Sequence, residues 1–336
     1  MNRVRIGVVG LGFGQQHVRT LANMIDAELV AVADRSSNLP GGLEGYAAHY
    51  GAKAYRDGVE MIEQEGLDAV TICISPASRE PLLRAAGEKG VVMLVEKPWA
   101  TNLEHARRLA QICETYNAKV MVAFSFRFHP AIVKLRQLMD SELGQGWLLN
   151  GDYLFSWVPP ADSWLWDPQN GNGFFNENSG HLFDAVCYLM GKPVSVMAEA
   201  INPMAAPSEN GAAVTIRFTN GGIAALTLGG IGIPAQKESP RIDIVTANGQ
   251  ARLSGREHIW ERLSWATRDG DATQNIVQSP EALGNTRYTD AFTHFLDRVR
   301  HNKQPSAEID DGIAAVALAL AVAESAKSGQ KVQIVV

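Results

Sequence analysis

The strongest constraint on the fold is the way apolar runs alternate with helical stretches over residues 1–124. These runs are hydrophobic throughout rather than alternately polar and apolar, which is typical of strands buried on both faces of a parallel sheet. We therefore predict a doubly wound parallel α/β domain at residues 1–124. Strands are expected at Val4–Gly10, Glu28–Asp34, near Ala54, and at Asp68–Ile74, Val91–Glu96 and Lys119–Phe124, with helices at Gln15–Met24, Leu43–Tyr50 and Ala77–Lys89 and another opened by a Thr101–Glu104 capping box.

The pattern changes after residue 124, where longer extended segments follow one another without intervening helices. Asn220-Gly221-Gly222 and Asn248-Gly249 separate pairs of such segments, and these are hairpin signals. Residues 125–336 are therefore predicted to form an α+β domain with a large open antiparallel sheet. Strands are expected at Trp147–Phe155, Val194–Ile201, Ala212–Thr219, Ile223–Leu228, Arg241–Ala247 and Gln250–Leu253, and helices at Ala131–Met139, Asp290–Arg300 and Asp310–Lys327.

Composition excludes several classes of protein. Lys plus Arg total 30 and Asp plus Glu total 36, giving a formal charge of −6 without a basic run, so a nucleic-acid partner is not expected. The uncharged apolar run Ile313–Ala323 is too short to cross a bilayer, and the N-terminus lacks the pattern of a signal peptide. Three widely spaced cysteines give no disulfide framework, and we expect a cytoplasmic protein.

A glycine-rich turn joins the first predicted strand to the first predicted helix. It reads Gly10-Leu11-Gly12-Phe13-Gly14, with the third glycine one residue earlier than in the usual G-x-G-x-x-G spacing. Such a turn brings backbone N–H groups and a helix N-terminus close to a pyrophosphate. Asp34 ends the second predicted strand, where an acidic residue binds the ribose hydroxyls. Together these features predict a dinucleotide-binding Rossmann domain, although a plain tight turn explains the glycines alone.

The residues around Asp34 bear on the choice of coenzyme. Its carboxylate accepts hydrogen bonds from ribose hydroxyls and repels a 2′-phosphate, which favours NAD. Arg35, Ser36 and Ser37 follow directly and could hold a phosphate, so NADP remains possible.

Glu96-Lys97-Pro98 follows the fifth strand, at the edge of the sheet where open α/β sheets bind their ligands. An ammonium group there can hydrogen-bond a substrate hydroxyl and stabilise a developing alkoxide. Ser75-Pro76 ends the preceding strand at the same edge. On this evidence alone, Lys97 could equally be an ordinary surface lysine.

The segment Gly171–Gly191 is predicted to run from a loop into one helix. Glu177 and His181 are four residues apart, so in a continuous helix they share a face, and a carboxylate beside a histidine suits proton transfer. Asp184 is expected to support them or to be structural. A polar helix face explains the same spacing. No second histidine or cysteine stands at ligand spacing, so no metal site is predicted.

These motifs together resemble the Gfo/Idh/MocA family of NAD(P)-dependent oxidoreductases, which includes glucose–fructose oxidoreductase and inositol dehydrogenases. The resemblance extends in order over essentially the whole chain, and its most specific element is Glu96-Lys97-Pro98. The other matching elements are the glycine turn, Asp34, Ser75-Pro76, Phe126-Arg127-Phe128-His129-Pro130, Trp166-Asp167-Pro168, Gly171-Asn172-Gly173, His181, Asp311-Gly312 and the final helix.

The resemblance implies that Lys97, Glu177 and His181 act together on a substrate. The family usually has Asp where Glu177 stands, His where Glu80 stands and three glycines at 171–173, which puts substrate contacts in doubt but removes no proposed catalytic group. Expected coenzyme contacts are Gly10, Gly12, Phe13, Gly14, Asp34, Arg35, Ser75, Pro76, Glu96 and Lys97. Expected substrate contacts are Lys97, Arg127, Trp166, Asn176, Glu177 and His181.

The activity that the resemblance implies is hydride transfer between NAD(P) and a secondary alcohol of a sugar, polyol or related molecule. Glycoside cleavage through transient oxidation, a non-catalytic ligand sensor and an imine or cyclic dipyrrole reductase remain open on the same scaffold.

Two interpretations remain open for three tryptophans and for two residues that follow the last parallel strand. Trp157, Trp164 and Trp166 could stack on a sugar or form core and dimer contacts, and Arg127 and His129 could border the cleft or be structural. The open face of the antiparallel sheet is expected to carry apolar residues, including Leu226, Leu228 and Ile244, and to pair subunits into a homodimer or homotetramer.

Overall fold

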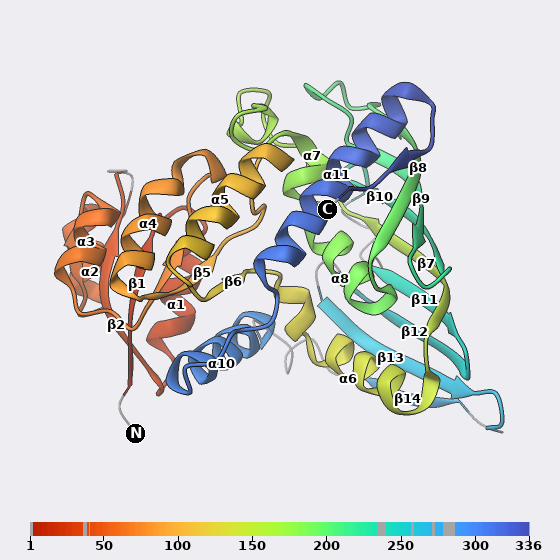
Figure 1. Ribbon diagram of the computed structural model, residues 1–336, viewed down its shortest axis with the longest axis horizontal. Helices are drawn as coiled ribbons and strands as arrows, with labels where there is room; N and C mark the ends of the chain where they lie inside the picture. Colours follow the sequence, from red (N-terminus) through yellow and green to blue (C-terminus); the bar gives the residue numbers. More distant parts are fainter. Residues whose placement is uncertain are drawn as a thin grey trace. The chain divides into compact units, whose positions relative to one another are not determined.

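The computed structural model divides the chain into two compact units (Figure 1). It describes residues 3–35, 39, 41–233, 240–256, 259–270, 273–277 and 286–335. The first unit comprises Met1–Ala123 and Tyr288–Ile313, and the second comprises Phe124–Arg287 and Ala314–Val336.

The first unit is built on a six-stranded parallel sheet with the strand order β3-β2-β1-β4-β5-β6. The order reverses between β1 and β4, which makes this pair the switch point of a doubly wound sheet. The predicted Rossmann architecture is therefore confirmed. The strands are β1 (Val4–Val9), β2 (Ala27–Ala33), β3 (Lys53–Tyr55), β4 (Ala69–Ile72), β5 (Val92–Val95) and β6 (Val120–Val122), and the helices between them are α1 (Gly14–Ala22), α2 (Gly42–His49), α3 (Gly58–Gln64), α4 (Glu80–Lys89) and α5 (Leu103–Thr115), with the 3-10 turn η1 (Pro76–Ser78).

Two helix starts differ from the sequence prediction. Helix α3 was not predicted; Asp57 caps it by accepting hydrogen bonds from the N–H groups of Val59 and Glu60. The predicted Thr101–Glu104 capping box is wrong. Asn102 is the N-cap of α5 instead, because its side-chain oxygen accepts the N–H of His105.

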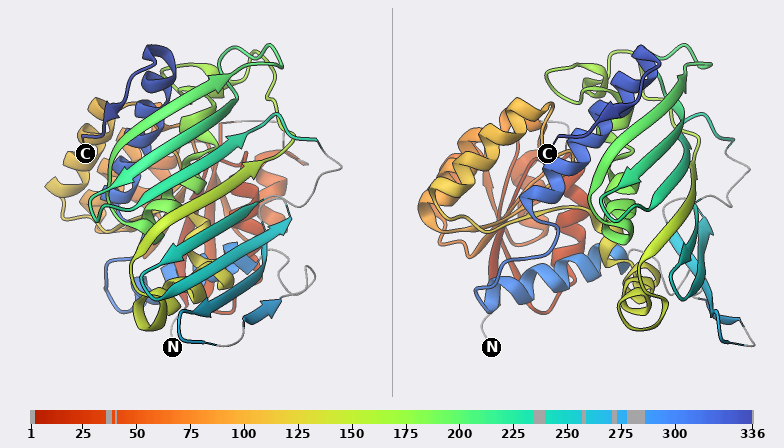
Figure 2. Two further views of the ribbon diagram at one scale, coloured as in Figure 1. Left: turned by 90° about the vertical axis from the view of Figure 1, so that its right-hand side faces the viewer. Right: turned by 45° about the vertical axis from the view of Figure 1, so that its right-hand side comes forward.

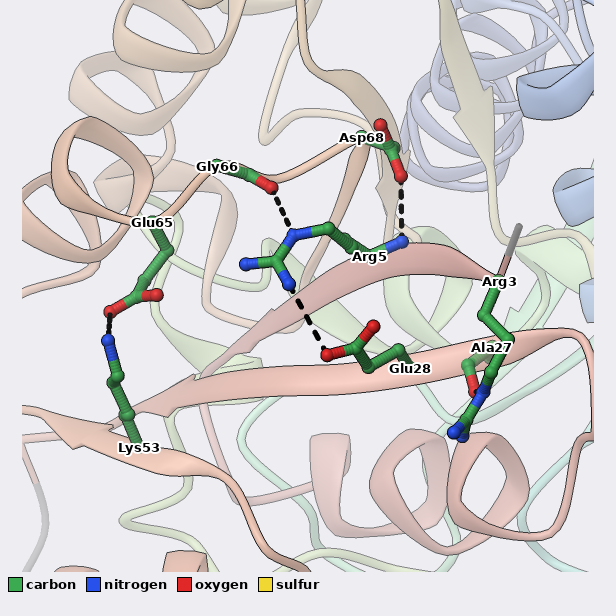
Figure 3. Close-up of polar contacts among 8 residues, drawn as sticks. All are labelled: Arg3, Arg5, Ala27, Glu28, Lys53, Glu65, Gly66 and Asp68. Atoms are coloured by element: carbon green, nitrogen blue, oxygen red, sulfur yellow. Dashed lines mark hydrogen bonds and ion pairs between the residues drawn. The ribbon is translucent and has the colours of Figure 1, made fainter.

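Polar side chains line the amino edge of this sheet (Figure 3). The Arg5 guanidinium donates to Gly66 O and to Glu28 Oε1, at 2.7 and 3.3 Å, and its backbone N–H donates to Asp68. A cavity of about 610 Å³ opens at the same edge, between residues 3–4, 67–68, 90–92 and 299–302. Dinucleotides bind at the opposite, carboxyl edge of such sheets, so this cavity is not the coenzyme site.

Residues 288–313 belong to the first unit, whereas the sequence analysis assigned everything after residue 124 to the second domain. Helix α10 (Thr286–Arg300) places the Phe292 ring 5.1 Å from the His17 ring, edge to face. Its last residue, Arg300, forms an ion pair with Asp26, and the N–H of Val122 in β6 donates to Ala307 O. These contacts hold the segment on the parallel sheet.

The second unit contains a nine-stranded sheet with the order β14-β13-β12-β11-β7-β10-β9-β8-β15 (Figure 2). All neighbouring strands are antiparallel except the parallel pair β7 and β10. Both predicted hairpins are confirmed, since β9 pairs with β10 and β11 with β12. The strands are β7 (Gly146–Leu154), β8 (Pro193–Ile201), β9 (Gly211–Phe218), β10 (Ile223–Gly229), β11 (Arg241–Thr246), β12 (Gly249–Arg256), β13 (Ile259–Thr267), β14 (Gln274–Val277) and β15 (Val332–Gln333).

Helices cover one face of this sheet. Helix α6 (Pro130–Leu138) packs on β12 and β13, and α8 (Gly180–Met190) packs on β7 (Figure 2). The second half of α11 (Ile309–Ser328) contributes Leu318 and Val322 to the same core. None of the helices in the described ranges has the length and apolarity to cross a membrane.

The prediction that Leu226, Leu228 and Ile244 line the open face is wrong. All three side chains are buried in the core beneath the helices. Alternation along a strand separates its two faces but does not say which face the helices cover. The exposed face instead carries Leu148, Met197, Ile201 and Val245, with an ion-paired row of Asp152, Arg241, Asp243 and Arg252.

Candidate functional site

The glycine turn of the first unit is shaped by close backbone contact with the end of β4. Gly10 has φ of +86°, and a Cβ atom there would lie 2.5 Å from Cys73 O. Only glycine fits this position. A Cβ atom at Gly12 would meet nothing within 4 Å, so the turn is open at that residue. The open backbone at Gly12 allows a pyrophosphate to approach the N–H groups of the turn, while the tight packing at Gly10 holds the turn in place.

Helix α1 begins at Gly14, directly after this turn. Phe13 occupies the N-cap position, and no side chain accepts a hydrogen bond there. The first N–H groups of the helix and its positive dipole end therefore face the turn, and an anion binds favourably at such an end. The exposed Phe13 ring makes an edge contact with Tyr288 at 6.0 Å between ring centroids. These residues fit a dinucleotide.

Asp34 stands at the carboxyl end of β2, beside the turn. Its Oδ2 accepts the N–H of Leu11, so the carboxylate also ties the turn to β2. The Arg35 side chain is 88% exposed and reaches no closer than 3.8 Å to Asp57. Ser36 and Ser37 lie outside the described residues. The group fixed at this position is therefore the carboxylate, which suits ribose hydroxyls better than a 2′-phosphate.

The remaining coenzyme candidates end the next two strands. Ser75 precedes η1, whose first residue is the buried Pro76, and Glu96 and Lys97 directly follow β5. The strands β2, β1, β4 and β5 are consecutive neighbours in the sheet. The fold thus brings together, on one edge, residues that are up to 87 positions apart from Gly10 to Lys97.

A buried ion pair supports the backbone of Lys97. Glu96 Oε1 lies 2.9 Å from His17 Nε2, and Glu96 Oε2 accepts the N–H of Lys97 at 3.1 Å. The Lys97–Pro98 peptide bond is cis. Burial of the His17 ring lowers its pKa, but the neighbouring Cys73 and Glu96 outweigh burial and raise the pKa of His17 to about 10. His17 was not predicted from the sequence, although it lies on α1 one turn after Gly14.

In the second unit, Glu177 and His181 do not lie in one continuous helix as predicted. Helix α7 (Gly173–Glu177) ends at Glu177, and α8 begins at Gly180. Between them the N–H groups of Asn178 and Ser179 both point to Phe174 O, at 2.9 and 3.4 Å. This shared acceptor breaks the regular i to i−4 ladder.

The break leaves two buried polar atoms without a protein partner among the described residues. They are Asn178 Oδ1 and Ser179 Oγ, on the two residues that join α7 to α8. A buried polar atom without a hydrogen bond is costly, and such atoms mark places where water or a ligand binds. Sequence reasoning missed both residues, although the polar run Asn176–Ser179 at a helix start signals them.

The His181 ring is held by an aromatic stack. It lies parallel to the Phe126 ring, with 5.0 Å between centroids and 23° between planes. Phe126 belongs to the 3-10 turn η2 (Ser125–Phe128), and Phe126 also contacts Tyr153 and Trp260 edge to face. This packing fixes the plane of the imidazole.

Arg127 and His129 have structural partners. The Arg127 guanidinium donates three hydrogen bonds of 2.6–2.9 Å to Asp184 on α8 and lies over the Tyr188 ring. The buried His129 ring lies between α6 and β13, with Nδ1 3.4 Å from Ala131 N and Nε2 3.2 Å from Trp260 N, and a neutral imidazole accepts only one of these two N–H groups. The pairing of Arg127 favours the structural interpretation of that residue over the predicted substrate contact, and it occurs within the second unit. Asp184 is likewise buried and structural.

The other predicted substrate residues lie before α7. The buried Asn176 donates from Nδ2 to Gly171 O at 2.8 Å, which closes the loop ahead of the helix. Trp166 ends the turn η4 (Trp164–Trp166), donates to Pro160 O and packs partly on the core. Trp157 and Trp164 are 40% and 48% exposed. Within the described parts of the chain, no group of His, Cys, Asp and Glu is arranged to hold a metal ion.

Known proteins are similar to this chain along nearly its whole length. Inositol 2-dehydrogenase of Rhizobium meliloti (strain 1021) is 26% identical over 342 residues, covering 98% of this chain and 99% of that protein. The scyllo-inositol 2-dehydrogenase (NAD(+)) of Bacillus subtilis (strain 168) is 25% identical and covers 99% and 97%. The fold is also that of a levoglucosan dehydrogenase solved with NADH and L-sorbose, with a TM-score of 0.85, 19% identity and full coverage of both chains.

Two family models cover nearly the whole chain, which confirms the resemblance drawn from the motifs. Residues 4–124 match "Oxidoreductase family, NAD-binding Rossmann fold", and residues 136–334 match "Oxidoreductase family, C-terminal alpha/beta domain". The protein is a member of the Gfo/Idh/MocA family of oxidoreductases and carries its NAD-binding Rossmann domain.

Proposed function

We propose that this protein is an NAD-dependent dehydrogenase that acts on a secondary alcohol of a sugar, a polyol or a related small molecule. The observation that carries the proposal is the gathering of the glycine turn, Asp34 and Lys97 on one edge of adjacent parallel strands. The relatives named as inositol dehydrogenases, and the related fold that binds NADH with L-sorbose, support the substrate class.

The chemistry divides between the coenzyme and this chain's own residues. NAD, when bound, supplies the acceptor for a hydride from the alcohol carbon. His181 takes the proton of the reacting hydroxyl, with its ring plane held by Phe126 and its orientation set by Glu177. The Lys97 ammonium group donates a hydrogen bond to the same oxygen and stabilises its developing negative charge. The proposal requires Lys97 and His181 to reach one hydroxyl.

The substrate's other hydroxyls are assigned to the junction of α7 and α8. Asn178 Oδ1 and Ser179 Oγ are buried there without a protein partner among the described residues, so a hydroxylated ligand would satisfy them. The neighbouring Asn176 and Trp166 complete this polar and aromatic surface. Arg127 is left out of the substrate contacts because Asp184 already binds it.

A substrate screen tests the activity directly. Inositols, aldoses, deoxy sugars and amino sugars are incubated with NAD and, in parallel, with NADP, while the absorbance of reduced nicotinamide is followed. We expect at least one polyol or sugar to reduce NAD faster than NADP, because Asp34 repels the 2′-phosphate. Turnover only with NADP would contradict the interpretation of Asp34. Glycoside cleavage without net NADH would favour the transient-oxidation alternative, and reduction of an imine with no sugar oxidation would favour the reductase.

Variants test the roles of the two groups. Lys97→Ala and His181→Ala should each lower kcat by about 10²-fold or more, with NAD affinity kept within about threefold. Lys89→Ala and His301→Ala are matched controls, because both residues are exposed and neither follows the carboxyl end of a strand. Near-normal turnover in either active-site variant would refute the role given to that residue. NAD binding without turnover on any substrate would favour the ligand sensor.

We also propose that the chain forms a homodimer or homotetramer through the open face of its nine-stranded sheet. Leu148, Met197, Ile201 and Val245 expose apolar side chains on one sheet face, and sheet faces of this kind are commonly covered by a partner. Light scattering should give a multiple of the chain mass that Leu148→Glu reduces, and a monomeric wild type would contradict the proposal. We further propose a cytoplasmic location, because the three cysteines of the sequence, Cys73, Cys113 and Cys187, are odd in number and widely spaced and so give no disulfide framework.

A further inference from the structure

Three side chains form a chain of polar contacts beneath the glycine turn, and the proposed reaction does not use it. Cys73 Sγ lies 3.3 Å from His17 Nδ1, and His17 Nε2 lies 2.9 Å from Glu96 Oε1. His17 and Glu96 are buried, whereas Cys73 is only partly buried. A thiol, an imidazole within hydrogen-bond reach of it and a carboxylate that orients the imidazole are the arrangement that activates cysteine nucleophiles.

Two buried cationic side chains, those of His17 and Arg79, lie near Cys73. Burial lowers the pKa of His17, but Cys73 and Glu96 outweigh burial and raise that pKa to about 10, so the imidazole holds its proton beside the sulfur. Arg79 is a second buried cation, which donates to the carbonyl of Ile74 and interacts electrostatically with both Cys73 and Glu96. Among these described neighbours, the only other acidic group is Glu96, which already shares the proton of His17.

The sulfur also lies against the first turn of α1. A Cβ atom built on Gly14 would lie 3.4 Å from Cys73 Sγ and 3.2 Å from Cys73 Cβ. A helix N-terminus stabilises a thiolate and raises its reactivity. In the proposed complex the first turn of α1 also faces the coenzyme. A group added to the sulfur of Cys73 would therefore occupy space beside the glycine turn.

We propose that Cys73 is a reactive thiol that small disulfides modify, and that its modification closes the glycine turn to the coenzyme. In this reaction the Cys73 thiolate attacks one sulfur of the disulfide, a new S–S bond forms and the old S–S bond breaks. The second sulfur leaves as a thiolate with the bonding electron pair and takes a proton from water. Cys73 is oxidised and the leaving sulfur is reduced. Cys73, His17 and Glu96 all belong to the coenzyme domain, so a failure of the substrate proposal would not contradict this one.

The chain's other cysteines provide internal controls. Burial raises the pKa of Cys113 to about 12, which keeps that thiol protonated and unreactive. Cys187 on α8 is partly buried like Cys73 but belongs to the second unit, whereas Cys73 belongs to the first. Cys187 is therefore the matched thiol against which the reactivity of Cys73 is measured.

The probe is methyl methanethiosulfonate, which adds a methylthio group and releases methanesulfinate. Modification of each cysteine in the full chain is timed by mass spectrometry of peptides at pH 7. We expect Cys73 to react at least about tenfold faster than Cys187, because the imidazole of His17 and the first turn of α1 lie against its sulfur. A rate at Cys73 no greater than that at Cys187 would overturn the proposal.

A variant and a binding measurement complete the test. His17→Gln should slow the modification of Cys73 by about tenfold and leave the rate at Cys187 unchanged; the wild-type comparison stands alone if this variant does not fold. Saturating NAD should slow modification of Cys73 and not of Cys187. Calorimetry should show NAD affinity falling at least tenfold after modification of the wild type, with no change on treatment of Cys73→Ala. Unchanged NAD affinity in fully modified wild-type protein would refute the closure of the turn.

Discussion

Loss of one partner of the Arg127–Asp184 pair should destabilise the second unit by several kilocalories per mole. The two side chains are 9% and 0% exposed and are joined by three hydrogen bonds of 2.6–2.9 Å. Removing one member of such a pair leaves a buried charge without compensation, at a cost of about 3–5 kcal/mol. We therefore expect Asp184→Asn and Arg127→Met each to lower the free energy of unfolding by about this amount.

Urea unfolding followed by tryptophan fluorescence measures this loss in the free energy of unfolding of the second unit. Six of the seven tryptophans belong to the second unit, so the signal reports chiefly on that unit. With a slope of about 2.5 kcal/mol per molar urea, the midpoint should fall by roughly 1–2 M. A loss of less than about 1 kcal/mol in Asp184→Asn would refute the assignment of a buried, compensated pair.

The double variant Arg127→Met/Asp184→Leu measures the interaction energy between the two residues separately from the loss of stability at each site. Removing both charges takes away the desolvation cost as well as the attraction, so the double variant should be more stable than either single one. The coupling energy from the cycle should be at least about 2 kcal/mol. Simple additivity of the two losses would show that each side chain acts through its own packing, for example Arg127 through the Tyr188 ring.

The remaining predictions concern the first unit. Because Cys73 and Glu96 raise the folded-state pKa of His17 from 6.5 to about 10 despite burial, the folded state binds this proton more tightly than the unfolded state. Stability from this group is fully present below pH 6.5 and is lost as pH rises towards 10, so urea unfolding at pH 7 and 9.5 should show a fall that His17→Gln lacks. Gly10→Ala should reduce NAD affinity at least tenfold by calorimetry, since its Cβ would lie 2.5 Å from a carbonyl oxygen; unchanged affinity would contradict the tight turn. Asp57→Ala should cost about 1 kcal/mol by removing the cap of α3, and thermal unfolding with no shift would show that the cap is dispensable.

The central strands of the parallel sheet could be predicted because they are buried along nearly their whole length. Every residue of β4 and β5 is buried, so their runs of apolar residues are unambiguous. Strand β13 was missed because Glu261, buried with Arg256 as its ion partner, interrupts the alternation of polar and apolar residues. The packing of residues 288–313 on the parallel sheet was not predicted, because contacts such as that of Arg300 with Asp26 join distant parts of the sequence.

The residues at the coenzyme edge could be predicted from the sequence, whereas the break between α7 and α8 could not. Carboxyl ends of parallel strands must meet at one edge, so topology alone brings Asp34 and Lys97 to the same side of the sheet. The relation between Glu177 and His181, in contrast, was inferred from helical spacing, which holds only while the hydrogen-bond ladder is regular. That ladder breaks after Glu177, where the N–H groups of Asn178 and Ser179 share the carbonyl of Phe174. The plane of the imidazole is held by its stack with Phe126, a contact between η2 and α8 that no local pattern encodes.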